Sequence, residues 1–184
     1  MQELSIEGFR LSPQQKRLWS LQQGVQSQPY RVQCAVLIEG NLNTKILELS
    51  LQKVSEKYEI LRTNFQGLPG MNFPLQVITA NRLPTLPYHN LTGLVIEEQQ
   101  SKIEAVFKAN NQLDFDFEQG SVLDISLALL APDRHILLVD LPAMNSDVAS
   151  IDNLVRKISG FYAAELQNQE LEDEPLQYVD IAEW

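Results

Sequence analysis

Hydrophobic residues recur along the chain with two different spacings, which predict helices and strands that alternate. Apolar residues three and four apart predict helices over Thr44 to Tyr58 and Val148 to Tyr162, and a partly apolar stripe predicts a third over Val95 to Asn110. Ser12 followed by Pro13, with a glutamine three residues after the serine, is typical of a helix start. Between these stretches lie short β-favouring runs. They are Tyr30–Glu39, Ile60–Phe65, Gln76–Thr79, Val122–Leu130 and His135–Leu141.

The order of these elements predicts the fold class. Ile136 to Val139 is apolar throughout, as expected of a strand that is covered on both faces. Helices alternate with strands, so we expect an α/β or α+β fold, a mixed sheet sandwiched by helices. No repeat or low-complexity linker divides the chain, so residues 1–184 are interpreted as a single unit.

Charge and hydropathy exclude several classes of function. The 24 acidic and 14 basic residues give a net charge of −10, which argues against nucleic acid as a partner. The apolar runs are far shorter than the roughly 20 residues that span a bilayer, and no secretory signal opens the chain. We therefore expect a cytoplasmic protein with no membrane partner.

The single cysteine offers no disulfide framework, and no cysteine–histidine cluster has the spacing of a metal site. Cys34 lies in a strand-like run, where it shares a face with Val32 and Val36. We expect a buried, inert thiol there and no metal or bound cofactor.

Four separated segments resemble one family, the condensation domains of nonribosomal peptide synthetases, which have a chloramphenicol-acetyltransferase-like fold. Each segment is similar to a family motif, and the four occur in the family's order. They are Leu11–Trp19 (S-x-x-Q-x-R-L-W), Lys57–Phe65 (R-H-E-x-L-R-T-x-F, first two positions changed), Phe115–Gly120 (F-D-L-x-x-G) and Tyr178–Trp184 (Y-x-D-Y-A-x-W).

The resemblance implies an activity and an architecture. Members of the family join a donor acyl thioester to an acceptor amine, and carrier-protein domains present both on phosphopantetheine arms. The resemblance implies no further cofactor. Family members continue into a second lobe of similar size, with the active-site tunnel between the lobes. We therefore expect residues 1–184 to form the N-terminal lobe, whose partners are carrier proteins and a C-terminal lobe that is absent after Trp184.

The reaction centre departs from the family. Its motif H-H-x-x-x-D-G aligns with Pro142–Val148, so Pro142 and Ala143 occupy the two histidine positions and Val148 the glycine position. The resemblance assigns the second histidine the role of general base or positioning group, a role that suits imidazole. Ala143 has no titratable atom, so we assign no catalytic residue and expect the chain alone to be inactive.

Neither histidine of the chain is expected to substitute. His135 begins a strand eight residues before Ala143, roughly 25 Å away in extended chain, and is interpreted as a surface residue at a turn. His89 has no motif around it. Asp140 and Asp147 do not have the D-x-x-x-x-D spacing of cyclisation-type relatives, and Asp140 is interpreted as a strand end at the edge of the lobe.

Asp147 matches the motif's aspartate, and the resemblance implies a structural role for it. It would pair with the arginine of L-R-T, here Arg62, in a shielded bidentate ion pair. The alternative is that Asp147 caps the helix that begins near Val148.

Three functions remain open at this stage. The chain is a condensation-type lobe without its reacting group, a non-catalytic module that docks or gates carrier proteins, or a divergent acyltransferase that works by positioning alone. Whether it contributes to an enzyme is undecided by the sequence.

Overall fold

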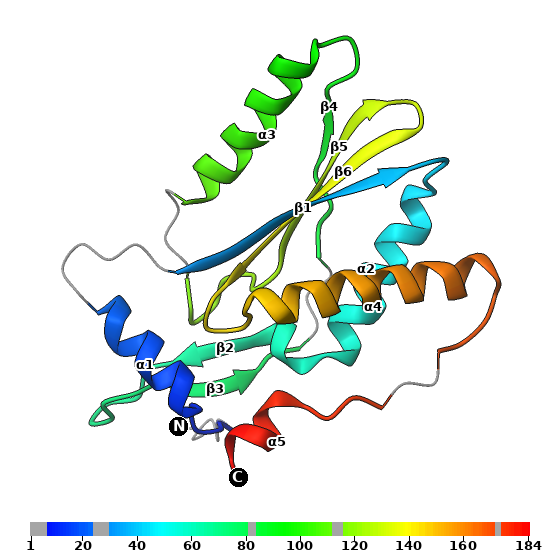
Figure 1. Ribbon diagram of the computed structural model, residues 1–184. Helices are drawn as coiled ribbons and strands as arrows, with labels where there is room; N and C mark the ends of the chain where they lie inside the picture. Colours follow the sequence, from blue (N-terminus) through cyan, green and yellow to red (C-terminus); the bar gives the residue numbers. More distant parts are fainter. Residues whose placement is uncertain (1–6, 24–29, 81–83, 112–115, 172–173) are drawn as a thin grey trace, which may run out of the picture.

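The computed structural model describes residues 7–23, 30–80, 84–111, 116–171 and 174–184 (Figure 1). Within these ranges helices and strands alternate, as the sequence predicts. The elements in chain order are α1 Pro13–Gln22, β1 Arg31–Glu39, α2 Thr44–Lys57, the 3₁₀ turn η1 Glu59–Arg62, β2 Thr63–Gln66, β3 Leu75–Ile78, β4 Tyr88–Asn90, α3 Ile96–Asn111, β5 Asp124–Ala131, β6 Arg134–Pro142, α4 Val148–Leu166 and α5 Tyr178–Ala182.

A four-stranded mixed sheet in the order β1-β6-β5-β4 forms the centre of the molecule. β6 pairs antiparallel with β1 and with β5, whereas β4 runs parallel to β5. Two further strands, β2 and β3, form a separate antiparallel hairpin-like sheet. The mixed sheet and the covering helices confirm the predicted fold class.

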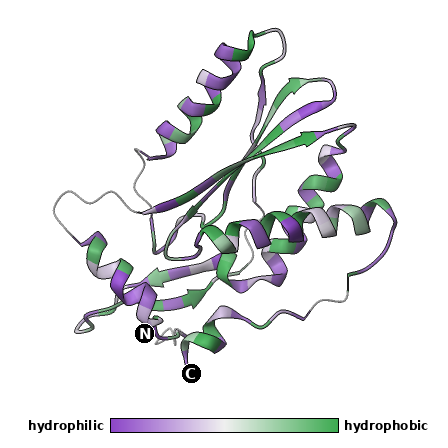
Figure 2. Ribbon diagram, viewed as in Figure 1, coloured by the Kyte–Doolittle hydropathy of each residue, from purple (hydrophilic) through white to green (hydrophobic). Residues whose placement is uncertain are grey.

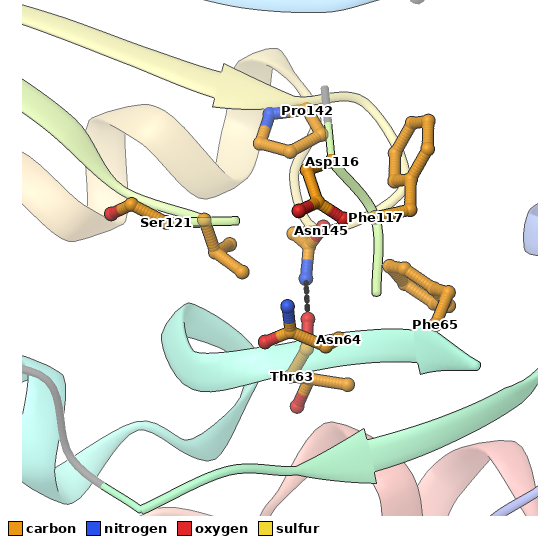
Figure 3. A pocket seen from close by; sticks show the side chains of 9 residues that line it. Thr63, Asn64, Phe65, Asp116, Phe117, Ser121, Pro142 and Asn145 are labelled. Carbon is orange, nitrogen blue, oxygen red and sulfur yellow. Dashed lines mark hydrogen bonds between the residues drawn. The ribbon is translucent and has the colours of Figure 1, made fainter. Parts of the chain in front are cut away.

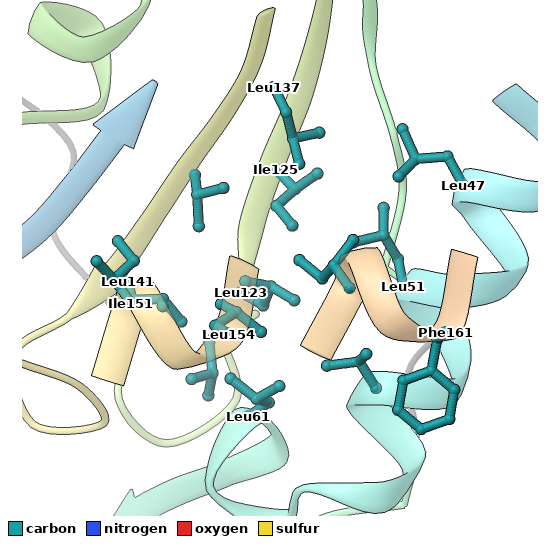
Figure 4. Close-up of a cluster of buried hydrophobic side chains, with 14 of the residues drawn as sticks. Leu47, Leu51, Leu61, Leu123, Ile125, Leu137, Leu141, Ile151, Leu154 and Phe161 are labelled. Carbon is teal, nitrogen blue, oxygen red and sulfur yellow. The ribbon is translucent and has the colours of Figure 1, made fainter. Parts of the chain in front are cut away.

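Helices α2 and α4 cover one face of the four-stranded sheet, and α3 lies on the other side (Figure 1). The main core lies between the sheet, α2 and α4, where side chains from all three interdigitate (Figure 4). Figure 2 shows the same segregation, with hydrophobic residues along the strands and on α2 and α4. The buried members of this cluster, called the sheet core below, are Leu47, Leu51, Val54, Leu61, Val122, Leu123, Ile125, Leu127, Leu137, Val139, Leu141, Ile151, Leu154, Ile158 and Phe161.

The predicted helix start at Ser12 is confirmed. The Ser12 hydroxyl accepts from the backbone N–H of Gln15 (3.2 Å), and the Gln15 side-chain oxygen accepts from the backbone N–H of Ser12 (2.9 Å). This reciprocal capping box satisfies two backbone donors that the first turn leaves free.

The sequence-based boundaries were wrong in two places. A strand was expected over Ile60–Phe65, but its first part forms the turn η1, because Thr63 donates its hydroxyl to the carbonyl of Glu59 (2.7 Å) and closes a helical turn. The short strand β4, whose only strand partner among the described residues is β5, is absent from the strands predicted by the sequence. Both features depend on hydrogen-bond partners that periodicity does not reveal.

The apolar stripe predicted to begin at Val148 is rotated by part of a turn. Val148 is 78% exposed and Tyr162 only partly buried, and the buried positions of α4 are Ile151, Leu154, Ile158, Phe161 and Ala164. Val148 is the first residue of α4, so it lies before the part of the helix that packs against the sheet.

No helix in the described ranges is both long and apolar enough to cross a membrane.

Candidate functional site

The segment Pro142–Asp147, called the site loop below, connects the end of the interior strand β6 to the start of α4, as the sequence predicts. Two backbone hydrogen bonds shape the first part of this loop. The N–H of Ala143 donates to the carbonyl of Tyr30 (2.8 Å), and the N–H of Asn145 donates to the carbonyl of Pro142 (2.9 Å). The loop therefore has a defined turn-like shape.

A second, smaller cluster of apolar side chains lies under the site loop. Met144 is 2% exposed and packs with Leu11 and Phe65. Phe117 meets Trp19 and Phe65 edge to face, at ring-centre distances of 5.9 and 6.2 Å. We call this group the loop cluster. Three of the four family-like segments contribute to it, so residues far apart in the sequence support this one loop.

Asn145 fixes the middle of the site loop to η1 and β2. Its side-chain N–H groups donate to the carbonyls of Ile60 (3.0 Å) and Thr63 (2.9 Å), which determines the orientation of the amide. Figure 3 shows the bond to Thr63. The residue is 6% exposed, and its side-chain oxygen has no hydrogen-bond partner among the described residues. Sequence reasoning had offered Asn145 only as a possible helix cap and missed this contact, because the two carbonyls are more than 80 residues away along the chain.

The third family-like segment, Phe115–Gly120, is hydrogen-bonded to β2, although its first residue, Phe115, lies outside the described residues. The Phe117 carbonyl accepts from the N–H of Phe65 (2.7 Å), and the Asn64 side chain donates to the Gly120 carbonyl (3.1 Å). A Cβ at Gly120 would lie 2.4 Å from the carbonyl oxygen of Asp116, so this turn accepts only glycine.

A cavity of about 10 Å³ lies between the site loop, β2 and this turn (Figure 3). Another, of about 20 Å³, lies near Arg62 and Gly120. A single water needs about this much space, so neither cavity can hold a substrate group.

Pro142 and Ala143, the two positions expected to align with the family's histidines, carry no titratable group. Pro142 is buried and completes β6, and Ala143 is half-buried at the start of the loop. The loop is thus shaped by hydrogen bonds and packing, while its expected reactive position presents only a methyl group.

The expected ion pair between Arg62 and Asp147 is not formed. Arg62 donates to the carbonyl of Thr79 (2.9 Å) and contacts the carboxylate of Glu59 at 3.3 Å. Asp147 is exposed and caps α4, accepting from the backbone N–H (2.7 Å) and hydroxyl (2.6 Å) of Ser150. These bonds from Ser150 hold the pKa of the Asp147 carboxyl below its ordinary value. The alternative interpretation, a helix cap, is correct because both charged groups find partners three residues away.

Two further interpretations were wrong. His135 is only 5% exposed, and its Nδ1 has no partner among the described residues. It pairs in register with Ile38, at the opposite end of β6 from Pro142. Asp140 does not lie at an edge but is 1% exposed inside β6, where it accepts from Arg31 (2.9 Å) and Gln33 (3.0 Å). A neighbouring strand supplies these partners, so no local sequence pattern marks them.

No group of three or more His, Cys, Asp or Glu among the described residues could hold a metal ion. Cys34 is a half-buried free thiol on the face predicted for it, next to Val32 and Val36, and burial raises its pKa. A raised pKa keeps the thiol protonated, which makes it a poor nucleophile.

Comparison with known proteins gives a consistent result. Residues 6–184 match the family model described as "Condensation domain". The chain is 30% identical over 182 residues to tyrocidine synthase 3 of Brevibacillus parabrevis and 29% identical over 180 residues to gramicidin S synthase 2 of Brevibacillus brevis. These alignments cover 97% and 96% of this chain but only 2% and 4% of those proteins.

Solved structures share the fold. The X-domain from teicoplanin biosynthesis superposes with a TM-score of 0.80 at 25% identity, over 96% of this chain and 37% of that chain. The starter condensation domain of rhizomide synthetase gives a TM-score of 0.80 at 20% identity, over 96% of this chain and 42% of that chain. The chain thus spans about two fifths of each of these structures.

Proposed function

Because the chain belongs to the condensation-domain family, with a match over residues 6–184, we propose that it forms the N-terminal lobe of a nonribosomal peptide synthetase condensation domain and that this lobe by itself makes no peptide bond. The observation that carries this proposal is Ala143, at the family's working histidine, in a loop that otherwise keeps a defined shape. A missing general base lowers the rate by about 10²–10⁴-fold.

Nearby polar groups do not replace the base. Asp147 is occupied with capping α4, and the Ser146 hydroxyl points to the Pro142 carbonyl (3.4 Å). His135 lies roughly 25 Å along β6 from Ala143. The Asn145 amide is turned toward Ile60 and Thr63, and an amide does not take up a proton in this pH range.

The proposal includes partners. Carrier proteins would bring both thioesters on their phosphopantetheine arms, and a C-terminal lobe would complete the tunnel, since the cavity beside the site loop is too small for substrate. The chain itself would bind no cofactor. A function on carrier-bound thioesters would place the protein in the cytoplasm. Arg62 would support the site through its contacts in the turn η1, and Asp147 would support it through its cap at the start of α4.

The direct test supplies the chain with a donor acyl carrier and an acceptor aminoacyl carrier and measures amide product by mass spectrometry. We expect none above the uncatalysed background, whereas a two-lobed condensation domain with both histidines serves as the positive control. Ala143→His should not rescue this chain, because positioning by the second lobe is itself a large share of such catalysis. Amide formed by the unmodified chain would contradict the proposal and favour an acyltransferase that works by positioning alone.

One observation favours a docking role as a second candidate. The X-domain that this chain resembles at 25% identity also occurs in a structure described as a complex with OxyB from teicoplanin biosynthesis. A lobe without a base would fit such a role. Calorimetric titration with loaded carrier proteins tests the docking role: saturable binding supports it, and no binding contradicts it.

A further inference from the structure

Gln15 is buried deeply for a polar residue near the start of a helix. It is 2% exposed, and its side chain makes three hydrogen bonds to three different partners. Its oxygen accepts from the Ser12 N–H, which completes the capping box of α1. Its nitrogen donates to the side-chain oxygen of Gln76 (2.9 Å) and to the backbone carbonyl of Met144 (3.1 Å) in the site loop.

The capping box explains only half of this side chain. A box at this position needs an acceptor oxygen, which glutamate supplies as well as glutamine. The two N–H donors are the part that only glutamine has, and both are used outside the helix, on Gln76 and Met144. The choice of glutamine is therefore explained by the loop and by β3.

The groups around Gln15 extend the connection in two directions. Gln76 is fully buried and donates to the carbonyl of Arg10 (2.8 Å). The Ser12 hydroxyl, which accepts from the backbone N–H of Gln15, also shares a hydrogen bond of 2.7 Å with the hydroxyl of Tyr178 in α5. A continuous chain of contacts thus leads from α5, through Ser12 and Gln15, to the carbonyl of Met144.

We infer that Gln15 is a positioning residue for the site loop and that Tyr178 couples α5 to the loop through Ser12 and Gln15. The Gln15 amide holds the Met144–Asn145 peptide group, one residue after Ala143, and so sets where the position expected to be reactive in the family lies. Met144 then packs into the loop cluster from a fixed backbone. This inference does not depend on the proposed function, because it concerns the geometry of the loop and not its chemistry.

The key variant is Gln15→Glu, which keeps the acceptor for Ser12 but replaces the donor group with an oxygen. That oxygen would face the Met144 carbonyl and the Gln76 oxygen, so the loop should detach while the helix start remains. The probe is the methyl NMR signal of ¹³C-labelled Met144, assigned through Met144→Leu. Met71, which is 49% exposed on a different segment, is the control signal in the same spectrum.

We expect the Met144 signal to move toward the position of a solvent-exposed methionine in Gln15→Glu while the Met71 signal stays in place. Exchange of the Asn145 amide hydrogen should become about tenfold faster, the effect of losing one hydrogen bond. Acidification should partly restore the Met144 signal, since burial raises a glutamate pKa and a protonated carboxyl regains one O–H donor. The three groups bonded to Gln15 are uncharged, and wild type at each pH corrects for other titrations.

Tyr178→Phe tests the coupling to α5, with Tyr162→Phe as its matched control. Each removes one hydroxyl hydrogen bond, but the Tyr162 hydroxyl bonds to the N–H of Asn43, roughly 21 Å along α4 from the site loop. Only Tyr178→Phe should shift the Met144 signal and speed exchange in the loop, by a smaller factor than Gln15→Glu. An unchanged Met144 signal in Gln15→Glu, the absence of recovery at low pH, or equal effects of the two tyrosine variants would overturn the inference.

Discussion

The sheet core and the loop cluster are both buried, but different interactions hold them. The sheet core contains fifteen buried apolar side chains of the described residues. The loop cluster has only three fully buried apolar members, Leu11, Phe65 and Met144, and buried amides lie beside it at Gln15, Gln76 and Asn145. Apolar burial is proportional to area and has no preferred direction, whereas hydrogen bonds weaken steeply when misaligned. The first cluster therefore stabilises the fold, and the second determines the position of one loop.

Under the proposed function, this difference explains how the site can lack a reacting group and keep its shape. Pro142 and Ala143 take no side-chain part in the amide contacts, which run through the Met144 carbonyl and the Asn145 side chain. Replacing histidines at the first two positions leaves these contacts untouched.

The largest expected effect tests the sheet core. Leu51→Ala, at a position 1% exposed, should lower the free energy of unfolding by about 2–5 kcal/mol, because it removes buried area and leaves a cavity. Leu49→Ala, on the same helix but 47% exposed, is the matched control and should cost far less. Urea titration measures both. Equal losses would mean that α2 does not pack on the sheet as described.

A smaller effect is expected for the amide that holds the loop. Asn145→Ala leaves the carbonyls of Ile60 and Thr63 without their donor and should cost about 1–3 kcal/mol. Asn41→Ala, at an exposed position in the turn after β1, controls for the loss of an asparagine. If directional contacts dominate here, loop amides in Asn145→Ala should also exchange faster than those of the sheet core. Uniform acceleration throughout would contradict the comparison.

The cap of α4 should contribute less again. Asp147→Ala should destabilise the protein by about 1 kcal/mol at neutral pH. The pKa of Asp147 is lowered in the folded state, so its contribution is present above the ordinary carboxyl value of 3.8 and is lost as pH falls through the folded value. Thermal unfolding of both proteins across this range should converge in acid. A difference that persists unchanged would show that the charge of Asp147 has no part in the cap.

The smallest expected effect has the opposite sign. Burial, together with the nearby charge of Asp140, raises the pKa of Asp124. A raised folded-state pKa means that the charged form is unfavourable in the fold, so Asp124→Asn should stabilise the protein at neutral pH, by less than about 1 kcal/mol because the residue is partly solvated. The gain should vanish as pH falls and the wild-type carboxyl takes up its proton. Asp133→Asn, in an exposed turn, is the control, and a gain of equal size there would refute this account.

Much of the fold could be predicted because its causes are local. The capping box at Ser12, the apolar period of α2 and the apolar run of β6 all depend on residues within a few positions of one another. The cap at Asp147 is local as well. Its contact with Ser150 spans three residues, and the arginine proposed as its partner finds Glu59 at the same separation.

The sequence by itself thus determined the order of elements, the mixed sheet and the position of a loop without histidine between β6 and α4. Only the tertiary structure decided which distant groups meet. It buried His135 at one end of β6, paired Asp140 with Arg31 across two strands, and brought Gln15 to the carbonyl of Met144, 129 residues away. The physical reason is that periodicity records which face of an element is buried, whereas a single polar contact depends on the packing of every element between its two partners.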